Sequence, residues 1–214
     1  INTYDINLVS LKFDASGLNQ SEKLDSKLFS YLMSASSTKD FSFEEISNNL
    51  TKYFFKLGLN NRTALLDNDN ISRRFVINFE YLQDDKTEVY NTLENLFLEG
   101  NFDNKLEIKK RLEGLRDSIL TSSSDANVIN RMSVIKTMSM INPNYNYYLD
   151  EEVNFGGRGY YVYPPMLTKL NKILDNYDEN FLQLQEDMKT IREKIFNKHN
   201  LLIFYSNRGN YQNF

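Results

Sequence analysis

Residues 73–82 read Arg-Arg-Phe-Val-Ile-Asn-Phe-Glu-Tyr-Leu, and this stretch decides the fold class. Arg74, Asn78 and Glu80 alternate here with large apolar side chains. A two-residue period is that of a strand with one buried face. The stretch therefore predicts a half-buried strand whose inward side chains are Phe75, Ile77, Phe79 and Tyr81.

Three further segments complete a predicted sheet. Ile6 to Phe13 has the same alternation, and Leu57 to Leu66 is a plausible strand just before residues 73–82. The polar turn Asp67 to Asn70 separates the last two, so an antiparallel hairpin is the simplest pairing. A short strand, Leu201 to Tyr205, closes the chain.

Helices are predicted where the apolar period lengthens to that of one helical face. The first begins at Ser21, and the second begins with Ser42-x-x-Glu45, the pattern of a capping box. Asp85-x-x-Glu88 predicts a third start, and Gly58 and Gly100 are expected to end the second and third helices. The expected buried stripes are Leu24, Leu28, Tyr31, Leu32 and Ala35; Ile46, Leu50, Tyr53 and Phe54; and Val89, Leu93, Leu96 and Phe97.

The second half of the chain is predicted to be mostly helical. Asn142-Pro143 should stop one helix, and Pro164-Pro165 follows a glycine-containing loop. The expected segments are a stripe of Leu106, Ile108, Leu112, Leu115 and Ile119, a stripe of Val128, Met132, Ile135 and Met138, and helices over Met166–Leu174 and Phe181–Phe196. The order β-α-α-β-β-α-α-α-α-α-β describes an α+β two-layer sandwich, a largely antiparallel sheet with helices packed on one face.

We expect residues 1–214 to form a single domain, with the end of the chain from about residue 207 acting as a linker to a following domain. The chain opens at Ile1, without an initiator Met, which suggests a processed product or a piece of a longer protein. No apolar run approaches the roughly 18–20 residues that cross a bilayer, and no signal peptide is visible. We expect a soluble intracellular protein, in the cytoplasm, the periplasm or an organelle matrix, with no membrane partner.

Composition excludes several kinds of chemistry. The chain has one His and no Cys, so a Cys/His zinc site, a Cys nucleophile, disulfides and iron–sulfur ligation are ruled out. It has 25 Lys and Arg against 29 Asp and Glu, a net charge of -4. That balance argues against a surface built to hold nucleic acid.

The single imidazole, His199, lies in a polar segment between a predicted helix and the last strand. It could act as a general base or a pH sensor. The favoured interpretation is an exposed turn residue at a helix C-terminus, because the sequence implies no Ser or carboxylate partner nearby.

A second candidate is the loop that contains Gly156, Gly157, Arg158 and Gly159. Its arginine could hold a carboxylate beside Tyr160 or Tyr161, but the spacing is that of neither a P-loop nor a dinucleotide fingerprint. A connection between helices is the favoured interpretation. The tyrosines around it, at 145, 147, 148, 160, 161 and 163, are typical of a core edge or an interface.

The carboxylates of the chain give no catalytic pair. Those between Glu186 and Lys194 lie beside basic residues, as on a solvated helix face, and Glu151-Glu152 is equally ordinary. The residues alone therefore predict no enzyme, with no catalytic, cofactor-binding or metal-binding residue.

Residues 28–32 (Leu-Phe-Ser-Tyr-Leu), followed by Ser37-Thr38-Lys39-Asp40-Phe41, resemble the active-site helix of zinc peptidases of the pitrilysin/insulysin (insulinase) family. That family has H-x-x-E-H there, then a G-T-K-x-Y-like stretch. Aligning residues 38–41 with the G-T-K-x-Y-like stretch, without gaps, places Leu28 and Leu32 at the two His positions and Tyr31 at the catalytic Glu position. The resemblance thus implies a copy that holds no zinc.

The resemblance covers essentially the whole chain. Phe102-Asp103 before a long charged helix resembles the family's approach to its distal zinc-binding Glu, with Glu107 and Glu113 in that region. Residues 122–126, 131–133 and 156–170 resemble the third homologous domain of the presequence-protease and falcilysin branch.

Such peptidases have four homologous α+β domains in two halves, which close around a chamber that admits unfolded peptides. The resemblance implies that this chain is an inactive domain that forms chamber wall and closure surface, with zinc in the catalytic domain of the parent protein. Its partners would be the other domains of the same polypeptide and the peptide substrate. Arg158 and Tyr160 are not assigned the role of the family's substrate-orienting Arg and Tyr, because they lie in another part of the domain. The alternative is a free-standing, non-catalytic interaction module that docks a protein through its Tyr-rich helical half.

Overall fold

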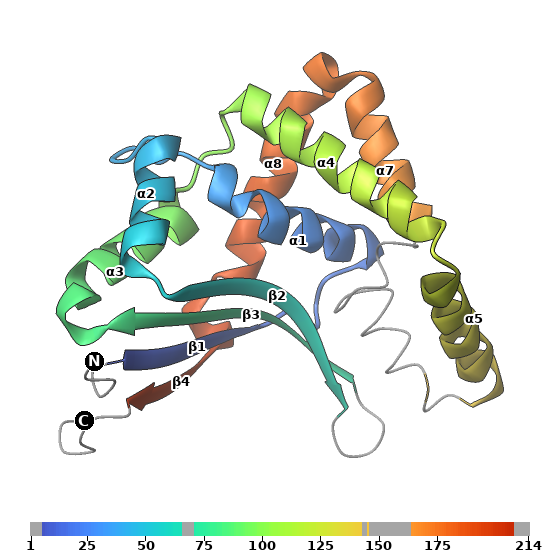
Figure 1. Ribbon diagram of the computed structural model, residues 1–214, viewed down its shortest axis with the longest axis horizontal. Helices are drawn as coiled ribbons and strands as arrows, with labels where there is room; N and C mark the ends of the chain where they lie inside the picture. Colours follow the sequence, from blue (N-terminus) through green and yellow to red (C-terminus); the bar gives the residue numbers. More distant parts are fainter. Residues whose placement is uncertain (1–5, 66–70, 143–144, 146–163, 208–214) are drawn as a thin grey trace.

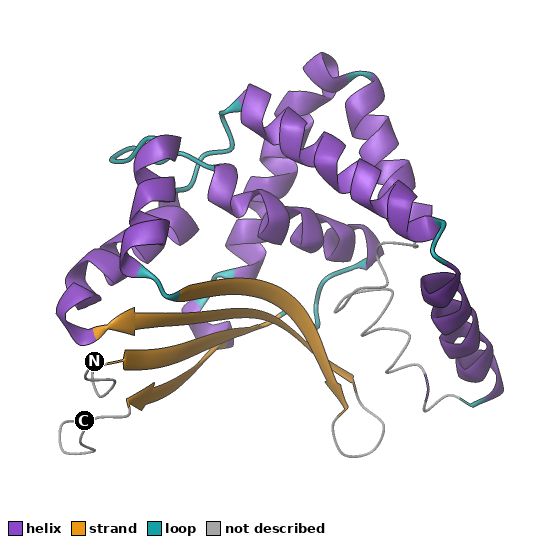
Figure 2. Cartoon of the chain, viewed as in Figure 1, coloured by secondary structure: helices purple, strands orange, loops and turns teal. Residues whose placement is uncertain are grey.

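Four strands form one sheet in the order β2-β3-β1-β4, and every neighbouring pair is antiparallel. The computed structural model describes residues 6–65, 71–142, 145 and 164–207. Helices cover one face of the sheet (Figure 1; Figure 2), so the predicted α+β class with helices on one face is confirmed. The strands are β1 (Ile6–Asp14), β2 (Lys56–Leu65), β3 (Ile71–Leu82) and β4 (Leu201–Asn207). The expected turn at 67–70 lies outside the described residues.

The helices follow the predicted order along the described chain. A 3-10 turn, Met33–Ala35, continues α1, and a π-helical turn, Asn95–Glu99, continues α3. The helices are α1 (Gln20–Leu32), α2 (Phe43–Tyr53), α3 (Lys86–Glu94), α4 (Lys105–Ser123), α5 (Ala126–Ile141), α7 (Pro164–Asp175) and α8 (Tyr177–Ile195).

The register aligns the apolar side chains of the two central strands on the helix side of the sheet. Val9 of β1 lies opposite Phe79 of β3, and Phe13 lies opposite Phe75. All four side chains are buried. The two-residue period that predicted β3 therefore marks the face that α1 covers.

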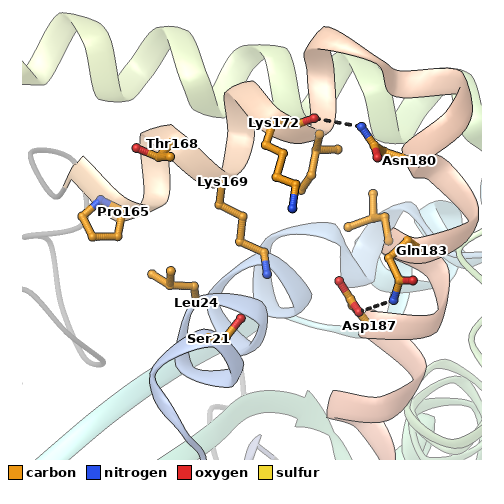
Figure 3. Close-up of a pocket in the computed structure, with 11 residues that line it drawn as sticks. Ser21, Leu24, Pro165, Thr168, Lys169, Lys172, Asn180, Gln183 and Asp187 are labelled. Carbon is orange, nitrogen blue, oxygen red and sulfur yellow. Dashed lines mark hydrogen bonds between the residues drawn. The ribbon is translucent and has the colours of Figure 1, made fainter.

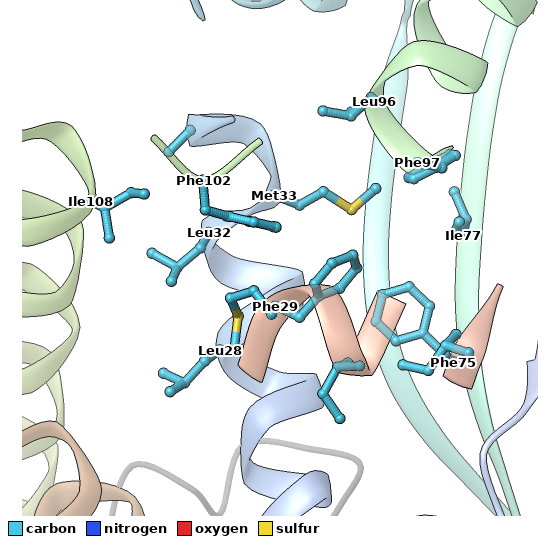
Figure 4. Packing of buried hydrophobic residues seen from close by; sticks show 14 of the residues in the cluster. Leu28, Phe29, Leu32, Met33, Phe75, Ile77, Leu96, Phe97, Phe102 and Ile108 are labelled. Carbon is cyan, nitrogen blue, oxygen red and sulfur yellow. The ribbon is translucent and has the colours of Figure 1, made fainter. Parts of the chain in front are cut away.

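Helix α1 packs between the sheet and the other helices (Figure 4). The ring of Phe29 lies at the centre, with centroids 6.0 Å from Phe75, 5.7 Å from Phe102 and 5.6 Å from Phe196. These rings come from a helix, a strand, a loop and the end of α8. Their edge-on and tilted contacts bring distant parts of the sequence into one core.

Two capping boxes begin the first two helices. In the predicted one, the Glu45 N–H donates to the Ser42 hydroxyl at 3.2 Å, and the Ser42 N–H donates to the Glu45 carboxylate at 2.8 Å. The second, between Asn19 and Glu22, was not predicted, although Asn-x-x-Glu is a capping pattern. Both boxes satisfy backbone donors that a helix start otherwise leaves free.

Several local predictions are wrong. Helix α2 ends at Tyr53, and Gly58 lies within β2. By contrast, the predicted start of α3 is confirmed, since Asp85 is its N-cap residue, although the Asp85 side chain makes no cap hydrogen bond. Tyr31 is 38% and Leu106 80% exposed, because the buried stripes of their helices continue through other positions. Helix α5 forms as predicted, but none of its residues is buried.

Replacing Ser42 with Ala removes the hydroxyl that accepts the Glu45 N–H, so we expect a loss of about 1 kcal/mol in unfolding free energy, measured by urea titration. Ser47 is the matched control, since it is exposed in the same helix. Ser47→Ala should leave stability unchanged or slightly higher, because Ala is the better helix former. Equal losses in both variants would show that the cap does not stabilise α2.

Candidate functional site

The two positions that align with metal-binding His residues lie in the core. Leu28 and Leu32 of α1 are each 0% exposed, and in Figure 4 both lie on the side of α1 that faces Ile108. Tyr31, at the catalytic Glu position, lies on the solvent side. In the described part of the chain, no three His, Cys, Asp or Glu side chains come together in a way that could hold a metal ion.

Of the two acidic residues in the distal region, the structure brings Glu107 toward the end of α1. Its carboxylate accepts from Arg111 Nε at 2.9 Å, and Arg111 Nη1 donates to the hydroxyl of Ser34 at 2.7 Å. Glu113, one and a half turns further along α4, acts instead on Tyr177 of α8, whose pKa is raised by burial and then by the charges of Asp178 and Glu113. Glu107 is thus linked through Arg111 to the segment after α1, whereas Glu113 acts on Tyr177 of α8 through its charge.

His199 lies on a 3-10 turn, Lys198–Asn200, that joins α8 to β4. It is exposed, and its backbone N–H donates to Asn197 Oδ1 at 3.0 Å, as the favoured turn interpretation expects. The expectation that no Ser or carboxylate lies nearby needs correction, because Asp14 and Ser16 line the same pocket. Asp14 and Ser16 lie at the end of β1 and just after it, and the sequence around His199 cannot reveal that they are close to it. The candidate loop around Arg158 and, apart from Tyr145, the surrounding tyrosines lie outside the described residues.

A larger pocket, of about 570 Å³, lies between the start of α1 and the helices α7 and α8 (Figure 3). Leu24, Ile173 and Leu184 give it an apolar wall. Polar groups surround this wall, and Asn180 Nδ2 donates to the carbonyl of Lys172 at 2.8 Å. The remaining lining residues are Ser21, Pro165, Thr168, Lys169, Gln183 and Asp187.

A buried ion pair lies next to this pocket. Lys169 of α7 reaches across to the carboxylate of Asp25 on α1, which is 6% exposed. Burial raises the pKa of Asp25, and the hydrogen bond and charge of Lys169 act against that rise. The sequence analysis missed this pair, because the partners lie far apart in sequence and no local pattern joins them.

The pocket is suited to binding rather than to catalysis. The ammonium of Lys169 already pairs with Asp25, and Asp187 accepts from Gln183 Nε2 at 2.9 Å. The ammonium of Lys172 points into the pocket from the next turn of α7 (Figure 3). An amphipathic molecule with a carboxylate would suit this combination of cation and apolar wall.

Comparison with known proteins adds a fold relationship. No family model and no curated protein matches the chain. A solved structure, a conserved protein from Enterococcus faecalis V583, superposes with a TM-score of 0.64 at 13% sequence identity. The match covers 97% of this chain and 45% of that one, so this chain spans less than half the length of its neighbour. The likeness shows a shared fold. Within the described residues, no helix is long and apolar enough to span a bilayer.

Truncating Leu28 to Ala should lower the unfolding free energy by about 3 kcal/mol, because it leaves a cavity in a fully buried part of α1. Tyr31→Ala, in the same helix but on the solvent side, should cost less than about 1 kcal/mol. Urea titration of both variants measures the difference. Similar losses at the two positions would contradict the assignment of Leu28 to the core.

The Asp25–Lys169 pair gives a pH prediction. Lys169→Met leaves a buried carboxylate without its cation, at a cost of about 3–5 kcal/mol at pH 7. The pKa of Asp25 then rises further, so between the ordinary value of 3.8 and the raised pKa the folded state binds the proton more tightly than the unfolded state. Stability therefore falls as pH rises through this window, and the deficit shrinks toward low pH.

The control is Lys172→Met, one turn along α7, whose side chain is exposed. It should change stability by less than about 0.5 kcal/mol at either pH. Thermal unfolding of both variants between about pH 4 and pH 7 separates the pH-dependent loss expected for Lys169→Met from the small, constant change expected for Lys172→Met. A deficit in Lys169→Met that stays constant over this range would refute the role assigned to Asp25.

Proposed function

We propose that this chain is a catalytically inactive domain of a zinc metalloendopeptidase of the pitrilysin/insulysin type, most similar to the third domain of the presequence-protease branch. In this proposal it forms wall and closure surface of a chamber that receives unfolded peptides. Zinc is held by the catalytic domain of the parent protein. The partners are the other domains of the polypeptide and the peptide substrate; neither nucleic acid nor a membrane is one. The intracellular location stays a prediction.

The observation that carries the proposal is the burial of Leu28 and Leu32 at the motif positions of α1. A domain copy without zinc cannot keep two unpaired imidazoles at these buried positions without a cost, because each unpaired polar group costs free energy when it is buried. Two leucines at these positions remove that cost and add apolar area to the core. The helix thereby changes from a catalytic to a packing element with little change in the fold.

Two further observations support the proposal. Arg111 links Glu107 on α4 to Ser34 beyond the end of α1, so the region that resembles the distal glutamate segment lies near the motif helix. The solved structure matched above is more than twice as long as its matched part, which suits a fold that serves as one unit of a larger protein. At 13% identity the neighbour supports the fold only.

The test uses the complete polypeptide that contains residues 1–214, beside the 214-residue chain alone. We expect the complete polypeptide to carry zinc and to cleave unfolded peptides but not folded proteins, with cleavage lost on chelation. The 214-residue chain should neither retain zinc after dialysis nor cleave peptides. His199→Ala in the complete polypeptide should leave zinc content and cleavage unchanged. Zinc bound in stoichiometric amount by the chain alone, or a complete polypeptide without zinc and without cleavage, would overturn the proposal.

The second candidate, a free-standing interaction module, is favoured by the surface of α5. Ile129, Val134, Met140 and Ile141 are between 43% and 81% exposed on this helix. Apolar side chains exposed together mark interaction surfaces. A complete polypeptide without peptidase activity that depends on α5 for binding a protein partner would support this candidate.

A further inference from the structure

The face of the sheet opposite the helices has a groove of its own. Two pockets, of about 360 and 390 Å³, open there and share Lys12 and Arg74 in their walls. Together they form what we call the outer groove, lined by Ser10, Lys12, Arg62, Arg74, Val76 and Leu202. These residues come from all four strands, so the groove crosses the face of the sheet instead of following one edge. In Figure 1 the labelled helices lie on the other side of the sheet.

The outer groove concentrates positive charge on an acidic chain. The register places Arg62 of β2 directly opposite Arg74 of β3, and Asp14 of β1 lies opposite Arg74 on its other side. Like charges directly opposite each other destabilise a sheet. The two pockets of the groove thus contain three cations, Lys12, Arg62 and Arg74, and one carboxylate, that of Asp14. The whole chain, by contrast, has a net charge of -4.

Apolar surface continues the groove toward the edge of the sheet. Leu202 and Phe204 of β4 are 48% and 51% exposed, and Lys12 Nζ lies 4.1 Å from the centroid of the Phe204 ring. Val76 is only 6% exposed, although it lies on the face that the described helices leave uncovered. The groove therefore combines a closed floor, cations along its middle and two exposed apolar side chains at one end.

We propose that the outer groove docks an amphipathic helix of a protein partner, with carboxylates over Lys12 and Arg74 and an apolar side chain against Leu202 and Phe204. Charge complementarity selects acidic partners and orients them. The groove spans several strands, and elements that pack across the face of a sheet in α+β proteins are helices, whereas extended segments pair along an edge strand. This inference goes beyond the proposed peptidase role and applies equally to a free-standing module.

The test measures binding of a labelled helical peptide of about 18 residues, with Glu beside a Leu/Phe stripe, to the 214-residue chain by fluorescence anisotropy. Three comparison probes are a peptide with Lys in place of Glu, a scrambled peptide of the same composition, and a single-stranded DNA oligonucleotide of equal charge. We expect the acidic amphipathic peptide to bind most tightly, and its affinity to fall when salt is raised from about 50 to 300 mM.

Charge removal locates the site. Arg74→Gln and Lys12→Gln should each weaken binding of the acidic peptide by about 5- to 10-fold. Phe204→Ser, on the exposed edge, should also weaken it. Lys189→Gln is the matched control, an exposed cation on α8, and it should change the affinity by less than about 2-fold. Circular dichroism of each variant shows that the fold is retained.

Four outcomes would overturn the proposal. Equal affinity of the Lys12, Arg74 and Lys189 variants would place the binding elsewhere. Equal binding of the scrambled peptide would exclude a helix as the occupant, and equal binding of the DNA would make the groove a nucleic-acid site. A dimer of the chain that dissociates in Arg74→Gln would identify a second copy as the occupant.

Discussion

Helix α1 is enclosed on nearly every side, and the rest of the structure depends on how its side chains are accommodated. The sheet covers one side through Phe29 and Phe75, α8 packs along α1, and Lys169 of α7 reaches Asp25 in it. A helix buried in this way carries polar groups into the interior, where each needs a partner. Asp25 therefore pairs with Lys169 of α7, and Ser26 accepts from Asn61 of β2 at 3.1 Å. These contacts fix the rotation of α1 and hence the placement of the helices packed on it.

In the proposed peptidase domain, the same enclosure would link the loss of a metal site to the gain of core packing. Imidazoles that bind zinc from a buried helix lose their partner when the ion is absent, and each unpaired imidazole then costs free energy in the core. Leu28 and Leu32 fill the buried side of α1 and have no side-chain polar atom that needs a hydrogen-bond partner. Tyr31 is exposed, and its position on the solvent side of α1 does not require an apolar side chain. Any residue that suits a helix surface fits there.

Periodicity predicted what a single face of one element controls. The alternation in residues 73–82 identified β3 and its buried face, and Ser42-x-x-Glu45 identified the start of α2, since both signals lie within a few residues. Local sequence patterns failed where burial depends on a partner that is distant in the sequence. The pairing of Asp25 with Lys169 and the exposure of α5 are decided by how elements meet, and a local pattern contains no record of that. The candidate site was missed for the same reason.

The two faces of the sheet separate folding from recognition. Side chains on the inner face meet α1 and the aromatic cluster, so a change there alters the core and lowers stability. The outer face contributes little to that core, and a charge there can be changed at small cost to the fold. Lys12 and Phe13 are adjacent in β1. The ring centroid of Phe13 lies 4.9 Å from that of Phe196 in the core, whereas Lys12 lines the outer groove. The alternation that builds the fold thus leaves outer-face positions such as Lys12 and Arg74 available to define a partner.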